Sequence, residues 1–409
     1  MVSGHGNRAE AVQVGCRGAV RSKMADISEF YAPEGGGVKA YVEAKFRAAE
    51  RMGHPVVLVA PGAEDRVEPR PGGRIVWVRS PVLPPDPKYR MFWKAAPVWA
   101  VLDQEQPDIV EGSSPWRGGW LAGKWSGRAP RVLFMHADPV AVYPQTFLGS
   151  FLPEARIDRL FGWFWSYLRR LDASFDRCVV AGQWLADRFA RHGLRKLEVV
   201  PFGVEAADFS PALRDDTVRA DMLRACGLDS SAALLVVVGR HHPEKRVPLL
   251  MRAVARAQQT RPVGLYVIGD GLMHDQIRKQ ASGLAHIHVA GAETNRHKLA
   301  QMLASADALL HGSTAETFGF VVAEALCSGT PLIVPAAGGA GDLARPAYAE
   351  TYKPGDVEDA ARAIERLLSR DRAEMSAKAR TAGLELGGMD RHFAQLFALY
   401  ARIIAEGRA

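Results

Sequence analysis

The sequence contains little cysteine and no apolar run long enough to cross a membrane. Its 409 residues include four cysteines, Cys16, Cys178, Cys226 and Cys327. No two of them form a Cys-x2-Cys pair, so the sequence predicts neither a zinc site nor a disulfide framework and favours a reducing compartment. No apolar run approaches the roughly 18 residues that a membrane span needs, and the N-terminus lacks the apolar core of a signal peptide. We therefore expect a cytoplasmic protein.

The chain also lacks an Asp-x-Asp triplet and any pattern typical of nucleic-acid binding. Its 52 basic and 45 acidic residues give a net charge of +7. A basic chain can bind nucleic acid, but there is no helix-turn-helix, zinc-finger or RNA-recognition pattern, and the arginines do not form one run. An anionic small molecule or an anionic membrane surface accounts for the sign of the charge equally well. We expect no nucleic-acid partner.

The length and the apolar patterning predict two α/β domains. A chain of 409 residues is longer than one hydrophobic core normally supports. Short apolar runs at residues 56–60, 75–78, 108–111 and 132–135 alternate with helical or loop segments, and the alternation resumes from 234 to 361. Such alternation predicts parallel sheets with crossover helices. Further on, 178–181 and 199–204 are expected to be strands, and 183–192 a helix.

Residues 306–335 predict four consecutive elements: a strand, a loop, a helix and a second strand. The apolar run at 306–310 is short enough to be that first, buried strand. Good helix formers follow Gly319 and end at Gly329, and Pro331 just beyond is a stop signal. The unit therefore places a loop between the carboxyl end of a strand and the start of a helix.

This loop is suited to binding an anion next to hydroxyl groups. Residues 316–320 would present free backbone N–H groups and the positive end of the helix dipole at the carboxyl edge of a parallel sheet, where phosphates commonly bind. Glu316 lies in the loop and Glu324 within the first two turns of the helix. Carboxylates accept hydrogen bonds from hydroxyls, so the arrangement suits a phosphorylated sugar. Alternatively, one glutamate caps the helix and the other lies on a solvated face.

Two more motifs lie upstream and favour the functional interpretation. A β-branched apolar run ends at Gly239, and Arg240 and Lys245 follow in a loop before a helix that begins near Val247. Residues 267–271 have the sequence Val-Ile-Gly-Asp-Gly. With the Glu-x7-Glu pattern, these motifs resemble the donor-binding signature of retaining glycosyltransferases of family 4, the group 1 glycosyltransferases. The resemblance covers about residues 24–385.

The resemblance implies an α/β protein with the GT-B fold, in which two Rossmann-like, doubly wound parallel-sheet domains face each other across a cleft. We expect an acceptor-side domain at 24–205 and a nucleotide-sugar-binding domain at 206–385. A C-terminal helix within 386–409, apolar at helical spacing, would cross back to the first domain. Residues 1–23 are expected to be an extension, either disordered or upstream of a native start at Met24.

The resemblance also assigns roles to individual residues. The donor is expected to be a UDP- or GDP-linked sugar, whose diphosphate Arg240 and Lys245 neutralise without a metal ion or another cofactor. Glu324 would bind the ribose and Glu316 the hydroxyls of the sugar. The expected catalytic residues are His136, Arg240, Lys245 and Glu316. The expected donor-binding residues are Gly36, Gly37, Gly239, Arg240, Lys245, Asp270, Glu316, Thr317, Phe318, Gly319, Phe320 and Glu324.

Two further elements are expected to reach the site from the first domain. Three glycines, Gly35 to Gly37, stand between a strand and a helix expected at 39–52, where backbone can approach a ligand closely. His136 directly follows the apolar run at 132–135. The resemblance places the glycine loop near the donor phosphates and the acceptor, and His136 near the reacting sugar or acceptor. The alternatives are a flexible turn and a structural histidine.

Residues 154–171 predict a basic aromatic helix, in which Arg156, Arg159, Arg169 and Arg170 interleave with Phe, Trp, Tyr and Leu. Such a helix fits an anionic membrane surface, where it would bring the enzyme to a lipid acceptor. It also fits a helix packed inside the first domain. The acceptor pocket is expected in that domain, where Lys88, Tyr89, Trp116, Arg117 and Tyr143 are available.

The sequence thus predicts a retaining hexosyltransferase that acts on a hydroxyl of a lipid-linked or cell-envelope glycan, in the cytoplasm or at the inner face of the membrane. Two alternatives stay open. One is a pseudo-glycosyltransferase that makes a non-glycosidic bond, which only its product would reveal. The other is a catalytically silent GT-B subunit for binding or scaffolding, which the intact motif residues disfavour.

Overall fold

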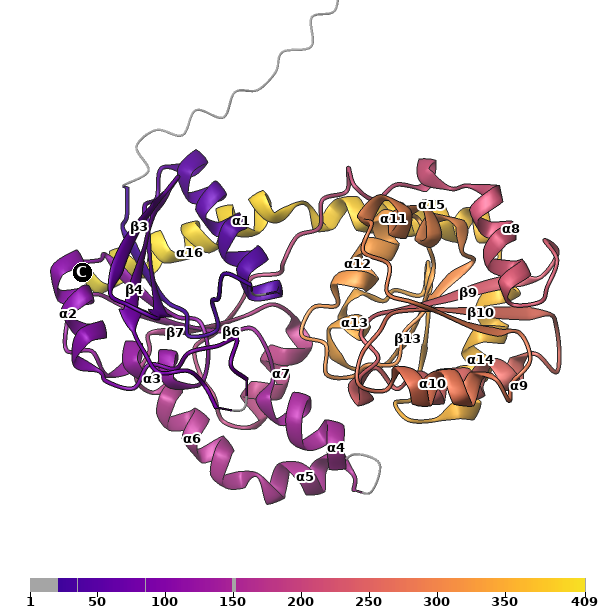
Figure 1. The fold of residues 1–409 in the computed structure, drawn as a ribbon, viewed down its shortest axis with the longest axis horizontal. Coiled ribbons are helices and arrows are strands. Elements are labelled where there is room, and N and C mark those ends of the chain that lie inside the picture. Colours follow the sequence, from indigo (N-terminus) through magenta and orange to yellow (C-terminus); the bar gives the residue numbers. More distant parts are fainter. Residues whose placement is uncertain (1–20, 35, 85, 149–151, 409) are drawn as a thin grey trace, which may run out of the picture.

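Two sheets, each covered by helices on both faces, lie side by side in the structure. The structure is a computed structural model that describes residues 21–408 except 35, 85 and 149–151. The elements up to β8 form one body and the elements from η2 to α15 form the other (Figure 1). This is the GT-B architecture that the sequence predicts.

The first sheet has eight strands in the order β3-β4-β2-β1-β5-β6-β7-β8. All neighbouring strands are parallel except β3 and β4. The central strands are buried along their whole length and are apolar apart from Asp26 and Glu111, because helices cover both faces of a parallel sheet. The strands are β1 (Met24–Ile27), β2 (Val56–Gly62), β3 (Arg66–Arg70), β4 (Gly73–Arg79), β5 (Ile109–Gly112), β6 (Arg131–Met135), β7 (Arg177–Val180) and β8 (Leu197–Val199).

Two details of this sheet differ from the sequence-based expectation. The antiparallel edge strand β3 was not expected, because it is polar, largely exposed and carries Pro69, which a strand tolerates only at an edge. The strand expected at 199–204 is wrong, because the ladder of β8 ends at Val199. Val200 donates one further backbone hydrogen bond, of 2.9 Å, to Val180 of β7, whereas Phe202 and Val204 are buried in the core outside the strand. Their apolar alternation indicated burial correctly, but not strand pairing.

The second sheet has six strands in the order β11-β10-β9-β12-β13-β14, all parallel. The strand-loop-helix-strand unit expected around 306–335 is present as β12, α12 and β13, although β12 begins only at Ala308. The strands are β9 (Ala233–Val238), β10 (Val263–Ile268), β11 (Ile287–Gly291), β12 (Ala308–Leu310), β13 (Leu332–Pro335) and β14 (Ala349–Tyr352).

Helices cover both sheets and follow the expected positions closely. The helix expected at 39–52 begins two residues earlier, at Gly37. In the first domain the helices are α1 (Gly37–Met52), α2 (Ala96–Glu105), α3 (Arg117–Lys124), the π-helical turn η1 (Ala141–Gln145), α4 (Thr146–Leu148), α5 (Glu154–Leu160), α6 (Gly162–Asp172) and α7 (Gln183–Arg191). In the second they are η2 (Pro211–Leu213), α8 (Asp216–Ala225), η3 (Pro243–Lys245), α9 (Val247–Ala257), α10 (His274–Ala281), α11 (Arg296–Ser305), α12 (Phe320–Cys327), α13 (Gly338–Leu343), α14 (Val357–Leu368) and α15 (Arg372–Leu386).

The basic aromatic segment at 154–171 is not one helix, because α5 ends before Phe161 and α6 begins at Gly162. The inner faces of the two helices are buried through Ile157, Phe164, Trp165, Leu168 and Leu171. The outer faces carry Leu160 and Trp163, which are 61% and 67% exposed, together with the four exposed arginines of the segment. The buried inner faces fit helices packed inside the domain, and the exposed outer faces carry the basic and aromatic residues of a surface helix. None of the helices that the structure describes is long and apolar enough to cross a membrane.

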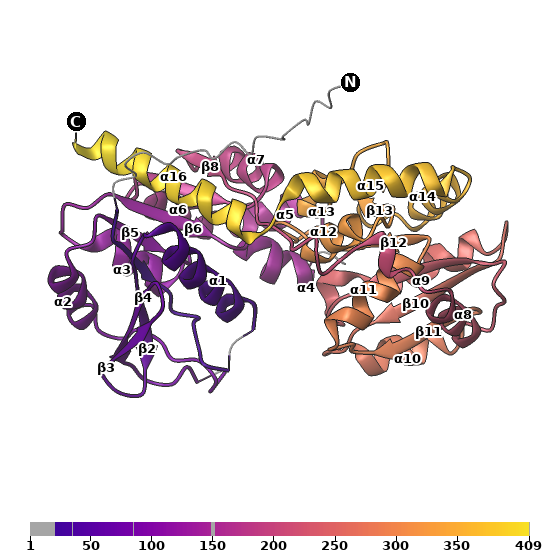
Figure 2. The ribbon, with the colours of Figure 1, turned by 90° about the horizontal axis from the view of Figure 1, so that it is seen from above.

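The last helix, α16 (Met389–Arg408), runs from the end of α15 along the first domain (Figure 2). His392 contacts Tyr41 of α1, with 3.1 Å between Nε2 and the tyrosine Oη, and its Nδ1 lies 2.8 Å from the carbonyl oxygen of Pro201. Phe393 packs on the ring of Tyr41, and Tyr400 donates a hydrogen bond of 2.6 Å to Glu111 of β5. The helix therefore links the end of the second domain to the core of the first.

Tyr400 belongs to a buried cluster of charges. The Lys45 ammonium lies 2.6 Å from an oxygen of Asp26 and 2.9 Å from Glu111, and all three side chains are at most 1% exposed. Burial raises the pKa of Asp26 to about 6. Burial also raises the pKa of Glu111, but Lys45 and Tyr400 together hold it below its usual range. Lys45 is the common partner of both acids, so removing it would leave two buried carboxylates without a counter-charge.

Three of the cysteines lie in the described part of the chain, and Cys178, Cys226 and Cys327 are all buried thiols without a disulfide. Burial raises the pKa of each. Cys16 lies outside the described residues, as does most of the predicted extension at 1–23.

The free energy of unfolding should fall when the pH drops from about 6.5 toward 4, and His392 should contribute to this loss. Burial lowers the pKa of His392 to about 4. Over this pH range the unfolded chain binds a proton that the folded chain does not, which removes up to ~3 kcal/mol. Urea unfolding at pH 7 and pH 5 should show a smaller loss for His392→Gln than for the wild type. His297→Gln, an exposed site on α11, should behave like the wild type. Equal losses in all three proteins would contradict the assignment to His392.

Candidate functional site

The candidate site is built around an ion pair between two loops of the second domain. Lys245 ends the turn η3 after β9, and Glu316 lies in the loop between β12 and α12. The Lys245 ammonium donates a short hydrogen bond to Glu316 Oε1. The two loops meet because β9 and β12 are parallel neighbours whose carboxyl ends share one edge of the sheet. Burial raises the pKa of Glu316, but Lys245 outweighs this effect and keeps the carboxylate ionised.

Glycines allow the backbone to pack closely beside this pair. Gly239 ends β9 with a φ of 147°, and the Lys245 side chain passes 3.5 Å from where a Cβ of Gly239 would lie. A Cβ at Gly269 would clash with the carbonyl oxygen of Gly239, so the ends of β9 and β10 can approach only with glycine there. The motifs at 239–245 and 267–271 are thus brought together as the sequence predicts.

A histidine that the sequence analysis missed faces the same pair. His311 directly follows β12, is 3% exposed, and its Nε2 lies 3.8 Å from Glu316 Oε1. This nitrogen has no hydrogen-bond partner within the described chain. Burial lowers the pKa of His311 to about 4, so the ring is neutral at pH 7. The sequence signal that could have identified it was its position, because His311 directly follows β12 just as His136 directly follows β6.

The loop that leads into α12 is held by a pair of glycines that was also missed. Gly319 caps α12 with a φ of 88°, Phe318 is buried, and Phe320 is 47% exposed. The N–H of Gly339 donates a hydrogen bond of 2.6 Å to the carbonyl oxygen of Glu316. A Cβ at Gly339 would lie 2.5 Å from the backbone nitrogen of Phe318. The sequence feature that could have revealed this contact is the Gly-Gly pair at the start of α13, just after β13.

Three of the expected donor-binding side chains lie apart from the ion pair. Arg240 is 80% exposed, with its guanidinium 3.8 Å from Glu244, although its charge also lowers the pKa of Glu316. Asp270 is exposed and accepts a hydrogen bond of 2.7 Å from the N–H of Gly271. Glu324 is nearly buried on α12 and pairs with Arg296 at 3.4 Å, while burial raises its pKa.

The first domain touches this site through the backbone of His136. Thr317 Oγ1 donates a hydrogen bond of 2.9 Å to the carbonyl oxygen of His136. The imidazole of His136 stacks on Phe134 with 4.3 Å between ring centroids and lies parallel to Phe202. Burial lowers the pKa of His136 to about 3, so this ring is neutral as well. The backbone of Trp184 adds a second interdomain contact, with its N–H 2.7 Å from a carboxylate oxygen of Asp342.

The glycine loop before α1 is not packed against the ion pair. Gly36 caps α1, and Gly37 is its first residue; both are exposed. A Cβ at either position would have no neighbour within 4 Å. Packing within the chain therefore does not require these glycines. Gly35 lies outside the described residues.

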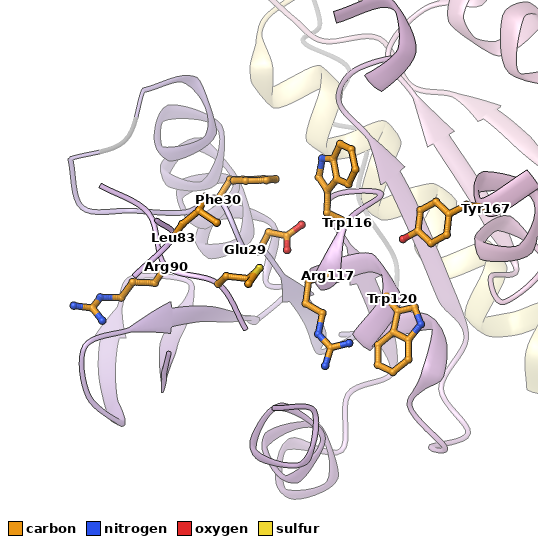
Figure 3. Close-up of a pocket in the computed structure, with 9 residues that line it drawn as sticks. Glu29, Phe30, Leu83, Arg90, Trp116, Arg117, Trp120 and Tyr167 are labelled. Atoms are coloured by element: carbon orange, nitrogen blue, oxygen red, sulfur yellow. The ribbon is translucent and has the colours of Figure 1, made fainter. Parts of the chain in front are cut away.

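The first domain contains a cavity of about 430 Å³ (Figure 3). Trp116 and Arg117 line it, as does Glu29, whose carboxylate accepts hydrogen bonds from Ser114 and from the N–H of Gly118. Burial raises the pKa of Glu29. Among the other residues considered for an acceptor, Tyr89 lies edge-on to Phe30 at the rim and Lys88 is exposed. The side chain of Tyr143 lies outside the described part.

No group of three His, Cys, Asp or Glu residues in the described chain is arranged to hold a metal ion. The site does contain the Lys245–Glu316 ion pair and, near it, the neutral ring of His311. The arrangement can bind an anion at Lys245 and hydroxyl groups at Glu316.

Comparisons with known families cover both domains. Residues 219–384 match the family model described as glycosyl transferases group 1, and residues 35–208 match the model described as glycosyltransferase family 4. The GDP-mannose-dependent alpha-mannosyltransferase of Mycobacterium tuberculosis (strain CDC 1551 / Oshkosh) is 30% identical over 331 residues, which are 79% of this chain and 82% of that protein.

Another relative, the GDP-mannose-dependent alpha-(1-6)-phosphatidylinositol dimannoside mannosyltransferase of Mycobacterium tuberculosis (strain ATCC 25177 / H37Ra), is 29% identical over 76% of this chain and 79% of its own. Among solved structures, sucrose-phosphate synthase from Thermosynechococcus elongatus is similar with a TM-score of 0.72 at 19% identity, covering 94% of this chain and 100% of that one. Anabaena HepE in complex with UDP-glucose has a TM-score of 0.66 at 16% identity, covering 92% and 100%. These two structures support the fold alone.

Replacing Gly339 by alanine should destabilise the protein, because the new Cβ would press on the backbone of Phe318. We expect the free energy of unfolding to fall by about 1–3 kcal/mol, as for overpacked cores. Urea denaturation measures this change. Gly283→Ala is the matched control, since a Cβ there would meet only the carbonyl oxygen of Gln280, at 3.7 Å. Similar stabilities of the two variants would show that the loop does not depend on this close approach.

Proposed function

The chain belongs to the group 1 glycosyltransferases with the GT-B fold, and from this premise we propose that it transfers a hexose from a nucleotide diphospho-sugar to a hydroxyl acceptor, with retention of anomeric configuration. The observation that carries the proposal is the Lys245–Glu316 ion pair at the carboxyl edge of the second sheet. The names of the relatives make GDP-mannose the first donor to test. UDP-sugars are the second, because a solved structure of the same fold contains UDP-glucose.

In this proposal the two charged groups of the ion pair contact different parts of the donor. The Lys245 ammonium faces the diphosphate, and the exposed Arg240 guanidinium can swing to it from its position 3.8 Å from Glu244. The Glu316 carboxylate accepts hydrogen bonds from the hydroxyls of the sugar. Fixed charges in a partly buried site stabilise the developing charge of the leaving group. One such charged group typically lowers the activation barrier by about 3–4 kcal/mol.

The loop and α12 position the nucleotide part of the donor. Backbone N–H groups of residues 317–320 add hydrogen bonds to the phosphates at the start of α12. Glu324 lies further along the same helix and is nearly buried, so its carboxylate suits the ribose hydroxyls. The exposed ring of Phe320, which stacks on Phe202 with 5.3 Å between centroids, closes the side toward the first domain.

We propose that the acceptor attacks the anomeric carbon of the sugar on the same face from which the leaving group departs. The acceptor oxygen forms a bond to the anomeric carbon, the bond from this carbon to the diphosphate oxygen breaks, and the acceptor proton passes to that oxygen. No protein nucleophile is required. Lys245 and Arg240 supply the positive charge, and we propose that the reaction is independent of metal ions. His136 is neutral, so its role would be to hydrogen-bond the sugar or acceptor rather than to donate a charge.

The proposed acceptor is a lipid-linked or cell-envelope glycan, and the proposed place of reaction is the cytoplasm or the inner face of the membrane. One relative is named for a phosphatidylinositol dimannoside acceptor, and the outer faces of α5 and α6 combine exposed arginines with Leu160 and Trp163. The alternative, a silent GT-B subunit, would not need Lys245 and Glu316 as a paired, half-buried unit.

Lys245→Ala should lower kcat by at least about 100-fold, because the diphosphate leaving group loses its nearest fixed charge. Initial rates with GDP-mannose and with UDP-glucose, measured by release of the nucleotide, test this. Lys279→Ala, an exposed site on α10, is the control and should keep the wild-type rate. Thermal unfolding of both variants checks that the fold is intact. A normal rate in Lys245→Ala would remove this lysine from the mechanism.

One nucleotide should raise the melting temperature of the protein in the presence of EDTA, because a ligand that binds only the folded state stabilises it. At a concentration of 100 times Kd the gain is about 2.7 kcal/mol. A panel of GDP, UDP and ADP with their sugars identifies the base. Glu324→Gln should reduce the shift at a fixed nucleotide concentration, whereas Glu358→Gln, an exposed site on α14, should not. No shift with any nucleotide would favour the silent-subunit alternative.

A further inference from the structure

A second cavity adjoins the one shown in Figure 3. It has a volume of about 620 Å³ and lies between α3 and α6. Trp116, Trp120 and Tyr167 line both cavities, so the two spaces share a wall of three aromatic side chains. We call the two adjacent cavities together the groove, which reaches from the loops after β1 and β5 to α6.

The inner end of this groove carries charges. Glu29 is 4% exposed, and its carboxylate is held by Ser114 and by the N–H of Gly118. Arg117 lies over the ring of Trp120 at 4.4 Å and donates to the carbonyl oxygens of Phe92 and Trp93. Arg90 also lines this end, but its guanidinium points away from the other lining side chains and donates to the carbonyl oxygen of Ser80 (Figure 3). A carboxylate that accepts from hydroxyls, the Arg117 guanidinium and aromatic faces suit a hydroxyl-rich head group that carries a phosphate.

The outer end is apolar with a basic rim. Phe164 and Leu171 of α6 form the buried wall, and Trp163 at the mouth is 67% exposed. Lys124 and Arg170 line the same end and are exposed. An apolar channel with basic residues at its opening is complementary to an aliphatic chain that emerges from an anionic lipid surface.

The position of the groove connects it to the candidate site. Glu29 follows β1, Trp116 follows β5 and His136 follows β6. These three strands are consecutive neighbours in the parallel sheet, so their carboxyl ends share one edge. The loop after β6 also contacts the second domain, through the hydrogen bond from Thr317 to the backbone of His136.

We propose that this groove binds the acceptor, and that the acceptor is an amphiphile. Its hydroxyl-rich head lies in the inner cavity, its phosphate contacts Arg117, and one aliphatic chain runs between α3 and α6 to leave the protein beside Trp163. The inference rests on the proposed glycosyl transfer and adds to it the class and the binding site of the acceptor.

A binding experiment with short-chain lipids tests the groove. The probes are dioctanoyl phosphatidylinositol below its micellar concentration, inositol 1-phosphate without a chain, and dioctanoyl phosphatidylcholine, whose head lacks hydroxyls. Isothermal titration of the full chain should show that the phosphatidylinositol binds at least about tenfold more tightly than either of the others, since only it uses both ends of the groove. Equal binding of the two lipids would overturn the head-group pocket, and equal binding of the two inositol compounds would overturn the channel.

Ser174→Trp should block the channel, because Ser174 lines the outer cavity just after α6. The variant should lose the tenfold advantage of the chain and still bind inositol 1-phosphate. Ser282→Trp is matched to it, because that serine also follows a helix and donates to a carbonyl of its last turn. Unchanged lipid affinity in Ser174→Trp would overturn the proposal.

A surface variant keeps the test valid if Ser174→Trp does not fold. Trp163→Ser should weaken lipid binding about five- to tenfold. Trp93→Ser should not, although Trp93 is equally exposed at 67%, because it lines neither cavity. Equal affinities in these two variants would overturn the proposed exit of the chain.

The nucleotide shift in melting temperature separates this inference from the proposed function. Wild-type protein that is stabilised by a nucleotide but shows no preference for the lipid overturns the groove and leaves glycosyl transfer in place. Wild-type protein that prefers the lipid but responds to no nucleotide supports the groove and overturns the transferase proposal.

Discussion

Parallel strand order is the constraint on which the rest of this structure depends. Lys245 and Glu316 are 71 residues apart in the chain, and they meet only because β9 and β12 are neighbours that end at the same edge of the sheet. The same rule brings Glu29, Trp116 and His136 to one edge of the first sheet. Because each carboxyl edge collects loops from several strands, each domain can vary its ligand contacts without changing its buried strands.

The two edges are held together by contacts that are specific rather than extensive. Thr317 bonds to the backbone of His136, Trp184 bonds to Asp342, and α16 packs on α1 through His392. α16 also reaches the buried charges around Lys45 through Tyr400. A lysine between two carboxylates tolerates little displacement, since any movement exposes an unpaired charge to a low dielectric. The position of the last helix is therefore coupled to the core of the first domain.

The charges of the two domains suit different ligands. In the second domain the Lys245 ammonium and the Glu316 carboxylate lie side by side, and the neutral His311 lies behind them. The ammonium suits an anionic group of a ligand, and the carboxylate suits hydroxyl groups only a few ångströms away. In the first domain the charges lie at one end of an aromatic groove and the apolar walls at the other. A compact anionic donor and an elongated amphiphilic acceptor would thus approach the cleft from different directions, so neither needs to displace the other.

Local sequence was enough to determine the elements and the motif residues of the donor side. Short apolar runs, Gly319 and Pro331 predicted β12, α12 and β13, because these elements depend on residues within a few positions of each other. That Lys245 and Glu316 belong to one site was implied instead by the resemblance of the three motifs to a known family. The break between α5 and α6, the unpaired strand-like segment after Val199, the contact of His311 with Glu316 and the groove between α3 and α6 could not be predicted in this way. Each depends on which distant residues pack against a segment, and only the tertiary structure decides which face is buried and which stays open to a ligand.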